Sequence, residues 1–399
     1  MPEGNRPENE EMSPSSIELS VVMPCLDEAE TLPICLKKAF SAMREAGVQG
    51  EVIVADNGSQ DGSVEIAEKA GARVIHVARR GYGSALMGGI AAARGPFVLM
   101  GDADDSYDFL EIPRFVEKLR EGYELVQGCR LPSGGGRVLP GAMPFLHRWF
   151  GNPLLSALAR GMFNAPVTDA YCGMRGFTQT LYKKLDQRCT GMEFATEMII
   201  KSSLHGARIA EVPITLHPDG RLAHGPHLRT FRDGWRTLRF FLLNSPRWLF
   251  LIPGLLLMAL GGLGFALALP GAEVLGARLD AHTLLASSLA LLMGFQSVLF
   301  ALLSKTFAIS EGLAPADPRL DRFYQWATLE RGLLVGSAAL LSGLLLIGST
   351  FFQWRSVDYG ALDYPLTLRW VIPGVTLAAL GFQTILSGFF VSILGMSRR

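Results

Sequence analysis

The sequence has no excess charge of either sign and few cysteines. Its 37 Lys and Arg residues balance 37 Asp and Glu residues, so the formal net charge at pH 7 is zero. A nucleic-acid-binding protein usually carries a basic surplus, so we expect no nucleic-acid partner. The five cysteines form no Cys-x-x-Cys pair and no Cys/His cluster with zinc spacing. This pattern predicts reduced thiols in the cytosol and no structural zinc.

The N-terminal segment lacks the features of a signal peptide. Residues 1–17 are rich in Pro, Glu, Asn and Ser, and no apolar core follows a charged start. This composition predicts a disordered lead-in. The domain that follows is therefore expected to be made in the cytosol and to remain there.

Residues 18–225 alternate short apolar runs with helical patterns. We expect strands near residues 19–23, 51–55, 73–77, 97–100, 125–128 and 208–216. Strands that alternate with helices predict an α/β domain with a Rossmann-like, mostly parallel sheet. Acidic or glycine-rich stretches follow the early strands, and ligands bind at the carboxyl ends of the strands in such sheets.

The last part of the chain consists of long apolar runs. Four of them lie near residues 248–270, 283–307, 332–354 and 368–394. Each holds about 20 residues or more, enough to cross a hydrocarbon core of about 30 Å as a helix. Four such runs are too many for the core of one soluble domain. Residues 248–399 are therefore expected to form an all-α transmembrane domain.

Basic residues near the spans predict the orientation. Arg319, Arg322 and Arg331 lie between the second and third spans, and Arg398 and Arg399 end the chain. Because basic loops stay on the cytoplasmic side, the middle loop, the tail and the large N-terminal domain are expected in the cytosol.

A different helical pattern precedes the first span. In residues 226–247 an apolar face is flanked by an arginine series. This predicts an amphipathic juxtamembrane helix in contact with membrane lipid, with a linker helix packed on the domain as the alternative. The apolar positions are Leu228, Phe231, Trp235, Leu238, Phe241 and Leu242, and the basic ones are Arg229, Arg232, Arg236 and Arg239.

The strongest chemical signal is the pair Asp102 and Asp104, directly after the strand near residues 97–100. Two carboxylates one residue apart on a bend can share one hard cation, and Mg²⁺ or Mn²⁺ takes oxygen ligands. A cation held there could bridge the diphosphate of a nucleotide-sugar and neutralise the leaving group. An acidic turn without a metal is the alternative.

Two earlier strand ends carry further candidates. Asp56 ends the second strand, where its carboxylate can accept a hydrogen bond from a nucleotide base, and Gly58 and Ser59 make the tight turn that follows. Asp61 is suited to capping the next helix. After the first strand come Asp27 and Glu28, and the backbone of Pro24 could flank the base.

These motifs together resemble glycosyltransferase family 2. The matching stretches are residues 21–28 (VVMPCLDE), 54–62 (VADNGSQDG), 81–85 (GYGSA), 102–104 (DAD) and 168–175 (TDAYCGMR). The chain is most similar to the branch that contains dolichol-phosphate mannose synthases and polyprenyl-phosphate glucosyltransferases. It departs from the usual pattern in having Asp27 where Asn is common and Asn57 where a second Asp is common.

The resemblance covers roughly residues 17–245 and implies a GT-A fold, a divalent metal and inversion at the sugar carbon. It implies that Asp102 and Asp104 bind the metal and that Pro24, Glu28 and Asp56 hold the nucleotide. The full set expected at the nucleotide-sugar site is Pro24, Leu26, Asp27, Glu28, Asp56, Gly58, Gly83, Asp102, Ala103 and Asp104.

The expected acceptor is a polyprenyl phosphate, undecaprenyl or dolichyl. A lipid monophosphate is already an anion, so it needs positioning and charge compensation, which arginine supplies with its forked guanidinium. The candidates are Arg130, Arg148, Arg175 and Arg221. The residues expected to act in catalysis are Asp104, Arg130, Arg175 and Glu197; Glu193 and Glu197 share a helix face and could serve as a base or orient the arginines.

The predicted function is transfer of a hexose, glucose or mannose, from a UDP- or GDP-sugar to the lipid phosphate. One alternative is a processive polysaccharide synthase, whose Gln-x-x-Arg-Trp acceptor motif has no match here. The other is a non-catalytic membrane scaffold or lipid translocator with a degenerate transferase domain. A homo-oligomer is left open.

Overall fold

The computed structural model describes residues 17–221, 230–274 and 276–395. The chain divides into two compact units, Met1–Phe241 and Leu242–Arg399. The predicted lead-in at residues 1–17 lies outside the described residues except for Ile17, as do Leu228 and Arg229 of the predicted amphipathic helix.

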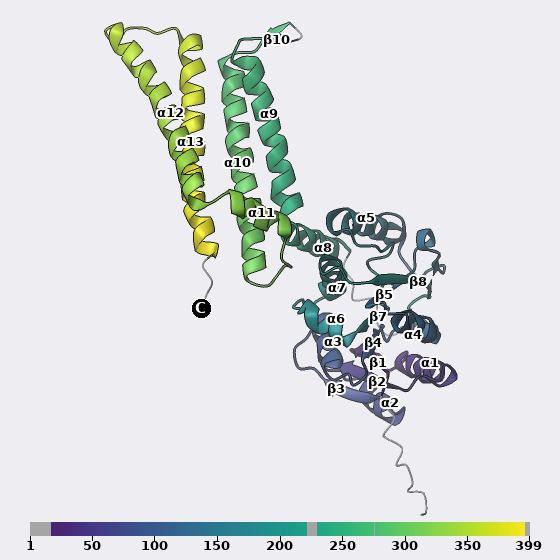
Figure 1. Ribbon diagram of the computed structural model, residues 1–399. Coiled ribbons are helices and arrows are strands. Elements are labelled where there is room, and N and C mark those ends of the chain that lie inside the picture. The colour runs from purple at the N-terminus through teal and green to yellow at the C-terminus, as the bar shows by residue number, and fades with distance from the viewer. Residues whose placement is uncertain (1–16, 222–229, 275, 396–399) are drawn as a thin grey trace, which may run out of the picture. The chain divides into compact units, whose positions relative to one another are not determined.

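The first unit is built on a seven-stranded sheet in the order β3-β2-β1-β4-β7-β5-β8 (Figure 1). All neighbouring strands pair in parallel except β7, which is antiparallel to both β4 and β5. This confirms the predicted α/β class with a mostly parallel sheet. The strands are β1 (Leu19–Cys25), β2 (Gly50–Asp56), β3 (Arg73–His76), β4 (Phe97–Met100), β5 (Leu125–Cys129), β7 (Arg175–Thr178) and β8 (Ile209–Pro213).

The sequence pattern does not predict strand β7. Its four residues read Arg-Gly-Phe-Thr, without the apolar run that marks the other strands. It is placed by pairing on both sides, with β4 and β5, and its arginine is fully buried. Two short strands, β6 (Arg137–Val138) and β9 (Thr215–Leu216), pair separately from the main sheet.

Helices cover both faces of the sheet and enclose two cores. Because side chains alternate along a strand, Val21 and Met23 of β1 belong to one core and Val22 to the other. Helices α1 (Leu32–Glu45), α2 (Ser63–Lys69) and α4 (Ile112–Arg120) contribute to the first core. The second core is lined by α3 (Tyr82–Ala91), α5 (Asn152–Phe163), α6 (Gln179–Leu185), α7 (Glu193–Leu204) and α8 (Thr230–Asn244). Burial on both faces explains why the strands read as apolar runs.

The second unit contains four helices long and apolar enough to cross a membrane, which confirms the four predicted spans (Figure 1). The first combines the π-helical turn η4 (Arg247–Leu251) with α9 (Ile252–Ala268), and the others are α10 (Ala281–Ser310), α12 (Leu329–Ser356) and α13 (Tyr364–Gly395). Shorter elements connect them: the strands β10 (Glu273–Val274) and β11 (Ala277–Arg278), and helix α11 (Pro318–Trp326).

Glycines bring neighbouring apolar helices into close contact. A Cβ built on Gly254 of α9 would lie 2.9 Å from the carbonyl oxygen of Gly294 on α10. On α12, a Cβ on Gly343 would lie 2.5 Å from the carbonyl oxygen of Gly374 on α13. Small residues permit such approach between membrane helices, where dispersion contacts replace the hydrophobic effect.

Candidate active site

The site lies where β1, β2 and β4 end side by side. These strands are parallel neighbours, and Cys25 pairs with Asp56 while Val22 pairs with Met100. The three acidic loops predicted from the sequence therefore leave the same edge of the sheet. Strand-end loops in open α/β sheets are the usual place for ligand binding.

The loops after β1 and β2 are tied together by hydrogen bonds. The Asp27 amide donates to Ser59 Oγ at 3.0 Å, and the Gln60 amide donates to Asp27 Oδ1 at 2.8 Å. The Glu28 amide donates to Ser63 Oγ at 2.9 Å. Asp27 has φ +58°, a left-handed conformation that Asn and Asp tolerate better than other side chains. This explains how Asp27 can replace the more common Asn.

Asp61 and Asn57 complete this network. Asp61 accepts from the amides of Ala29 and Ser63, at 2.8 and 3.0 Å, so it joins the two loops as well as holding the start of α2. The Asn57 side chain donates to the carbonyl oxygens of Val77 and Arg79, and its oxygen accepts from the Gly81 amide. Because a carboxylate cannot donate, the amide at position 57 is required for this double role.

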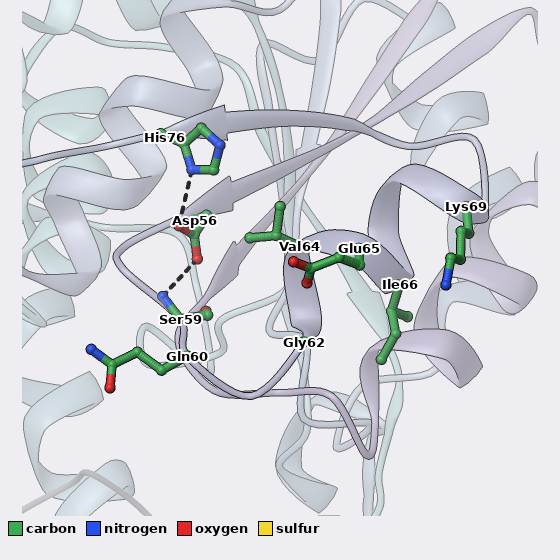
Figure 2. A pocket seen from close by; sticks show the side chains of 9 residues that line it. All are labelled: Asp56, Ser59, Gln60, Gly62, Val64, Glu65, Ile66, Lys69 and His76. Carbon is green, nitrogen blue, oxygen red and sulfur yellow. Dashed lines mark hydrogen bonds and ion pairs between the residues drawn. The ribbon is translucent and has the colours of Figure 1, made fainter.

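Asp56 is buried and lines a pocket of about 650 Å³. Its carboxylate accepts from the amides of Gly58 and Ser59 and lies 3.2 Å from His76 Nδ1. Burial raises the pKa of Asp56, but these hydrogen bonds outweigh it and leave the pKa below its usual value. Figure 2 shows Asp56 between His76 and Ser59; the pocket is lined by Asp56, Ser59, Gln60, Gly62, Val64, Glu65, Ile66, Lys69 and His76.

Asp102 lies in the loop directly after β4 and is half-buried. Its Oδ1 accepts a 2.9 Å hydrogen bond from the Tyr82 hydroxyl, at the first residue of α3. Burial, followed by the charge of Asp104, raises the pKa of Asp102 to about 7. Gly173 lies against this carboxylate, because a Cβ there would be 2.9 Å from Asp102 Oδ2. In the sequence Tyr82 is noticeable only as part of a glycine-rich motif. The structure adds that its hydroxyl group donates a hydrogen bond to Asp102.

Residues 217–221, here called the strap, place Arg221 against the acidic loops that follow β1 and β4. The Gly220 amide donates to the Asp104 carbonyl, and the His217 amide donates to the Ser106 carbonyl. Arg221 Nε lies 2.9 and 2.8 Å from the two oxygens of Glu28, and its Nη2 lies 3.4 Å from Asp104 Oδ2. Burial lowers the pKa of the guanidinium, but the carboxylates outweigh it and raise the pKa overall. Glu28, Asp104 and Arg221, three predicted site residues from distant parts of the chain, thus meet.

A second charged pair joins the end of β5 to the segment before β7. Arg130, directly after β5, donates three hydrogen bonds to Asp169: Nε to Oδ2 at 2.7 Å, Nη2 to Oδ1 at 2.9 Å and the backbone amide to Oδ2 at 3.0 Å. Tyr107 Oη accepts from the Gly173 amide at 2.8 Å and lies 3.4 Å from Arg130 Nη1. Burial raises the pKa of Asp169, but Arg130 outweighs that effect and lowers it. Tyr107 and Gly173 therefore connect this pair to Asp102.

The remaining predicted arginines occupy different surroundings. Arg175 is fully buried and donates to the carbonyls of Cys172 and Ala195 at 2.6 and 2.5 Å. Arg148 stacks on Trp149 with its guanidinium carbon 5.4 Å from the ring centroid, and within the described chain its buried Nε has no hydrogen-bond partner. Burial, followed by the charge of Arg130, lowers the pKa of His147, the residue before Arg148.

The predicted carboxylate Glu197 lies on α7 and is almost fully buried. It accepts from the amides of Arg188 and Cys189 and pairs with Lys201 at 2.8 Å. These partners order the segment before α7. Glu193 lies 3.9 Å from Arg236 of α8.

Five of the residues predicted for the nucleotide site have no charged or hydrogen-bonding side chain, and the structure shows their backbone conformation or packing. Pro24 lies inside β1 and pairs with Ala55, and Leu26 follows as a half-buried residue. Ala103 is buried between the two aspartates. Gly83 packs in the first turn of α3, where a Cβ would lie 2.4 Å from the Cys189 carbonyl oxygen. Gly58 has φ +96°, which the turn after Asp56 requires.

In residues 17–221, 230–274 and 276–395 no group of three or more His, Cys, Asp or Glu side chains is arranged to hold a metal. Asp102 and Asp104 nevertheless fit a divalent cation, because burial, followed by the charge of Asp104, raises the pKa of Asp102, and a cation would offset both effects. With two protein ligands, the rest of the coordination would come from substrate phosphates and water, as is common for Mg²⁺.

An open, mostly parallel sheet with acidic loops at its strand ends is the arrangement in which α/β enzymes commonly bind nucleotides. The family comparisons agree. Residues 20–186 match the model for glycosyl transferase family 2, and residues 302–395 match the model for the glycosyltransferase family 2 C-terminal transmembrane region.

One relative extends this match over most of the chain. The low-salt glycan biosynthesis hexosyltransferase Agl6 of Haloferax volcanii is 39% identical over 378 residues, which span 94% of this chain and 89% of the relative. The dolichyl-phosphate hexose transferase of the same organism is 34% identical over 198 residues, 49% of this chain and 82% of the relative. A structure of glucosyl-3-phosphoglycerate synthase from Mycobacterium tuberculosis has 25% identity and a TM-score of 0.45, covering 57% and 80% of the two chains.

The chain therefore belongs to glycosyltransferase family 2, and it is a multi-pass membrane glycosyltransferase. The resemblance inferred from the sequence motifs is confirmed.

Proposed function

We propose that the protein transfers a hexose from a nucleotide-sugar to a polyprenyl phosphate, with inversion at the sugar carbon, at the cytoplasmic face of the membrane. The observation that carries this proposal is the meeting of Glu28, Asp104 and Arg221 beside Asp102, in a chain with four membrane-spanning candidates. The name of the dolichyl-phosphate hexose transferase supports the choice of acceptor.

The donor is assigned to the edge of the sheet formed by β1, β2 and β4. Asp56 and the adjoining pocket take the base, where a carboxylate can accept from a ring N–H. The diphosphate then lies towards Asp102, Asp104 and Arg221. A divalent cation held by the two aspartates would offset the negative charge that the departing nucleotide diphosphate gains.

The protein contributes positioning and charge to the donor half of the site. Tyr82 fixes the Asp102 carboxylate through its hydroxyl. Arg221 holds Glu28 and Asp104 together before donor binding, and its fork-shaped guanidinium is suited to phosphate oxygens afterwards. When the donor binds, its phosphate oxygens would replace Glu28 and Asp104 as partners of Arg221. The Arg221 guanidinium would then be paired both before and after donor binding.

The acceptor phosphate is assigned to Arg148 together with Arg130. Arg130 is fixed by Asp169 through two of its nitrogens, and Nη1 points towards the Tyr107 hydroxyl. Arg148 has a buried Nε without a partner in the described chain. Arg175 also has a buried Nε without a partner in the described chain, but both of its terminal nitrogens donate to backbone carbonyls, so its proposed role is to hold the Cys172–Ala195 region in place.

The reaction needs no general base. The lipid phosphate is an anion whose oxygen attacks the sugar carbon, and the bond from that carbon to the nucleotide diphosphate breaks, its electron pair leaving with the diphosphate. A single displacement inverts the configuration. Glu197, paired with Lys201 and two backbone amides, is assigned to positioning the segment before α7.

The test is transfer of radiolabel from UDP-glucose and GDP-mannose to undecaprenyl or dolichyl phosphate in membranes that contain the full chain. Metal-dependent label in the lipid fraction supports the proposal and names the donor. Label in a growing water-soluble polymer would instead indicate a processive synthase. Absence of transfer and of donor binding by calorimetry, across both sugars, would favour a non-catalytic scaffold.

A further inference from the structure

The first turn of α3 packs directly against the backbone of the residues that precede α7. The Ser84 amide donates to the Thr190 carbonyl oxygen at 3.1 Å. A Cβ at Gly81 would lie 2.4 Å from the same oxygen, and a Cβ at Gly83 would lie 2.4 Å from the Cys189 carbonyl oxygen. No side chain fits at such a distance, so both glycines are required for the contact. The start of α3 therefore rests on two carbonyl groups that lie about 100 residues further along the chain.

The Glu197 carboxylate of α7 fixes the position of these carbonyl groups. Glu197 is buried, and its Oε2 accepts from the amides of Arg188 and Cys189 at 3.0 and 2.8 Å. Its Oε1 lies 2.8 Å from Lys201 Nζ. Hydrogen bonds to a charged acceptor are stronger than those between neutral groups. Because Cys189 is bonded to Glu197 through its amide and contacts Gly83 through its carbonyl, movement of the Glu197 carboxylate would shift the support of α3.

The residue placed by this support is Tyr82, the first residue of α3. It stands between Gly81 and Gly83, the two glycines that touch the residues before α7. Its hydroxyl donates to Asp102 Oδ1 at 2.9 Å. A displacement of Tyr82 by about 0.6 Å away from Asp102 would lengthen this bond to about 3.5 Å, the limit for a hydrogen bond. The orientation of the Asp102 carboxylate is therefore sensitive to small shifts of α3.

We propose that Glu197 is a positioning residue for the metal site. It acts on Asp102 through the residues before α7, the first turn of α3 and the Tyr82 hydroxyl. The proposal rests on the proposed function, in which Asp102 and Asp104 hold a divalent cation. Groups that orient a metal ligand set metal affinity although they do not touch the metal. In this role Glu197 takes no part in bond making or in proton transfer.

Direct binding of Mn²⁺ to the full chain in detergent tests the proposal without any need for transfer. The free Mn²⁺ concentration is measured by electron paramagnetic resonance, with no nucleotide present, and Asp104→Asn identifies the binding that belongs to the site. Glu197→Asp keeps the charge but withdraws the carboxylate from the two amides. The matched control is Asp186→Asn, which removes an exposed ion pair with Arg188 at a left-handed position that suits asparagine.

We expect Tyr82→Phe to raise the Kd for Mn²⁺ roughly 10- to 100-fold and Glu197→Asp to raise it about tenfold. The double variant should match Tyr82→Phe within about twofold, because both substitutions interrupt one route to Asp102. Gly83→Ala disturbs the same contact from the side of α3, because its methyl group would press on the Cys189 carbonyl. It should weaken Mn²⁺ binding in the same way, and Asp186→Asn should leave the Kd unchanged.

Two results would overturn the positioning role while leaving the metal site in place. One is an equal Kd in Glu197→Asp and Asp186→Asn. The other is a fully additive effect in the double variant, because Glu197 would then act by a route that does not include Tyr82, such as general loosening of the fold. If the unmodified chain shows no Asp104-dependent binding of Mn²⁺, the metal assignment of the proposed function fails, and the role of Glu197 fails with it.

Discussion

Arg221 and Glu28 form a largely buried ion pair across 193 positions of sequence, with Nε 2.8 Å from Oε2. The pair closes the strap at residues 217–221 over the acidic loops, and the same guanidinium reaches Asp104. The contact therefore links the end of the catalytic unit to its first loop and to the metal-site candidates.

Substitution of Arg221 tests this link. Arg221→Lys keeps the charge but loses the fork, so we expect kcat/KM for the donor to fall roughly 10- to 100-fold, the value of one or two charge-assisted hydrogen bonds. The matched control is Arg114→Lys on the outer face of α4, where the side chain is exposed. Equal donor kinetics in the two variants would remove Arg221 from the donor site.

The metal dependence of transfer should depend on Asp104 and not on the next residue, Asp105. Asp104→Asn is expected to lower transfer at least about 100-fold at saturating donor, in line with loss of a main source of charge stabilisation. EDTA should abolish transfer, with recovery on addition of Mg²⁺ or Mn²⁺. Asp105→Asn is the control, because Asp105 pairs with Lys38 and its φ of +58° suits asparagine. Activity of Asp104→Asn at the level of this control would contradict the metal assignment.

Tyr82 is expected to tune the metal affinity. Tyr82→Phe removes the hydrogen bond to Asp102 Oδ1 while keeping the ring in the core. Loss of a partner that orients a metal ligand commonly weakens metal affinity about 10- to 100-fold. Titration of activity with Mn²⁺ should show that shift, with near-normal activity restored at saturating metal. Tyr123→Phe serves as the control, and an unchanged midpoint in Tyr82→Phe would show that the bond is dispensable.

Arg148 should affect the acceptor and not the donor. Arg148→Gln is expected to raise the KM for lipid phosphate roughly tenfold or more, the effect of one charge-assisted hydrogen bond of about 1.5–3 kcal/mol. The KM for the nucleotide-sugar should stay within error of the parent. Arg137→Gln, at an exposed position in β6, is the control. An equal rise in both KM values would indicate a general structural effect.

The Arg130–Asp169 pair should contribute to stability with a defined pH dependence. The folded-state pKa of Asp169 is lowered, so its contribution is present above the ordinary carboxyl pKa of about 4 and is lost as the pH falls below it. Asp169→Asn leaves Arg130 buried and unpaired, with an expected cost of about 3–5 kcal/mol.

Thermal unfolding of the full chain in detergent at neutral pH measures that cost. Glu121→Gln, which affects an exposed pair with Lys118, should change stability by less than about 1 kcal/mol. A loss in Asp169→Asn no larger than in Glu121→Gln would show that the buried pair is not a stabilising element.

Local patterns are sufficient to predict much of this protein. The apolar runs that end at Asp56 and Gly101 mark strands buried on both faces, and the four long apolar runs mark the spans. Parallel neighbours place their carboxyl ends on one edge of a sheet, so strand order along the chain assigns the acidic loops to one site. Such features depend on neighbours in sequence and on the regular geometry of helices and strands.

Contacts between distant segments cannot be read in the same way. The antiparallel strand β7 exists because β4 and β5 pair with it on both sides. The bond from Tyr82 to Asp102 and the double role of Asn57 likewise depend on how α3 packs against the sheet.

The sequence by itself determined the two-part organisation, the α/β class, the spans and the acidic strand ends, because periodicity and chain order encode them. Only the tertiary structure decided which partners each arginine has: Arg221 reaches Glu28 and Asp104, Arg130 is held by Asp169, and Arg175 is committed to backbone carbonyls. The physical reason is that the role of a guanidinium is set by the groups it contacts, and those groups lie far away in the chain.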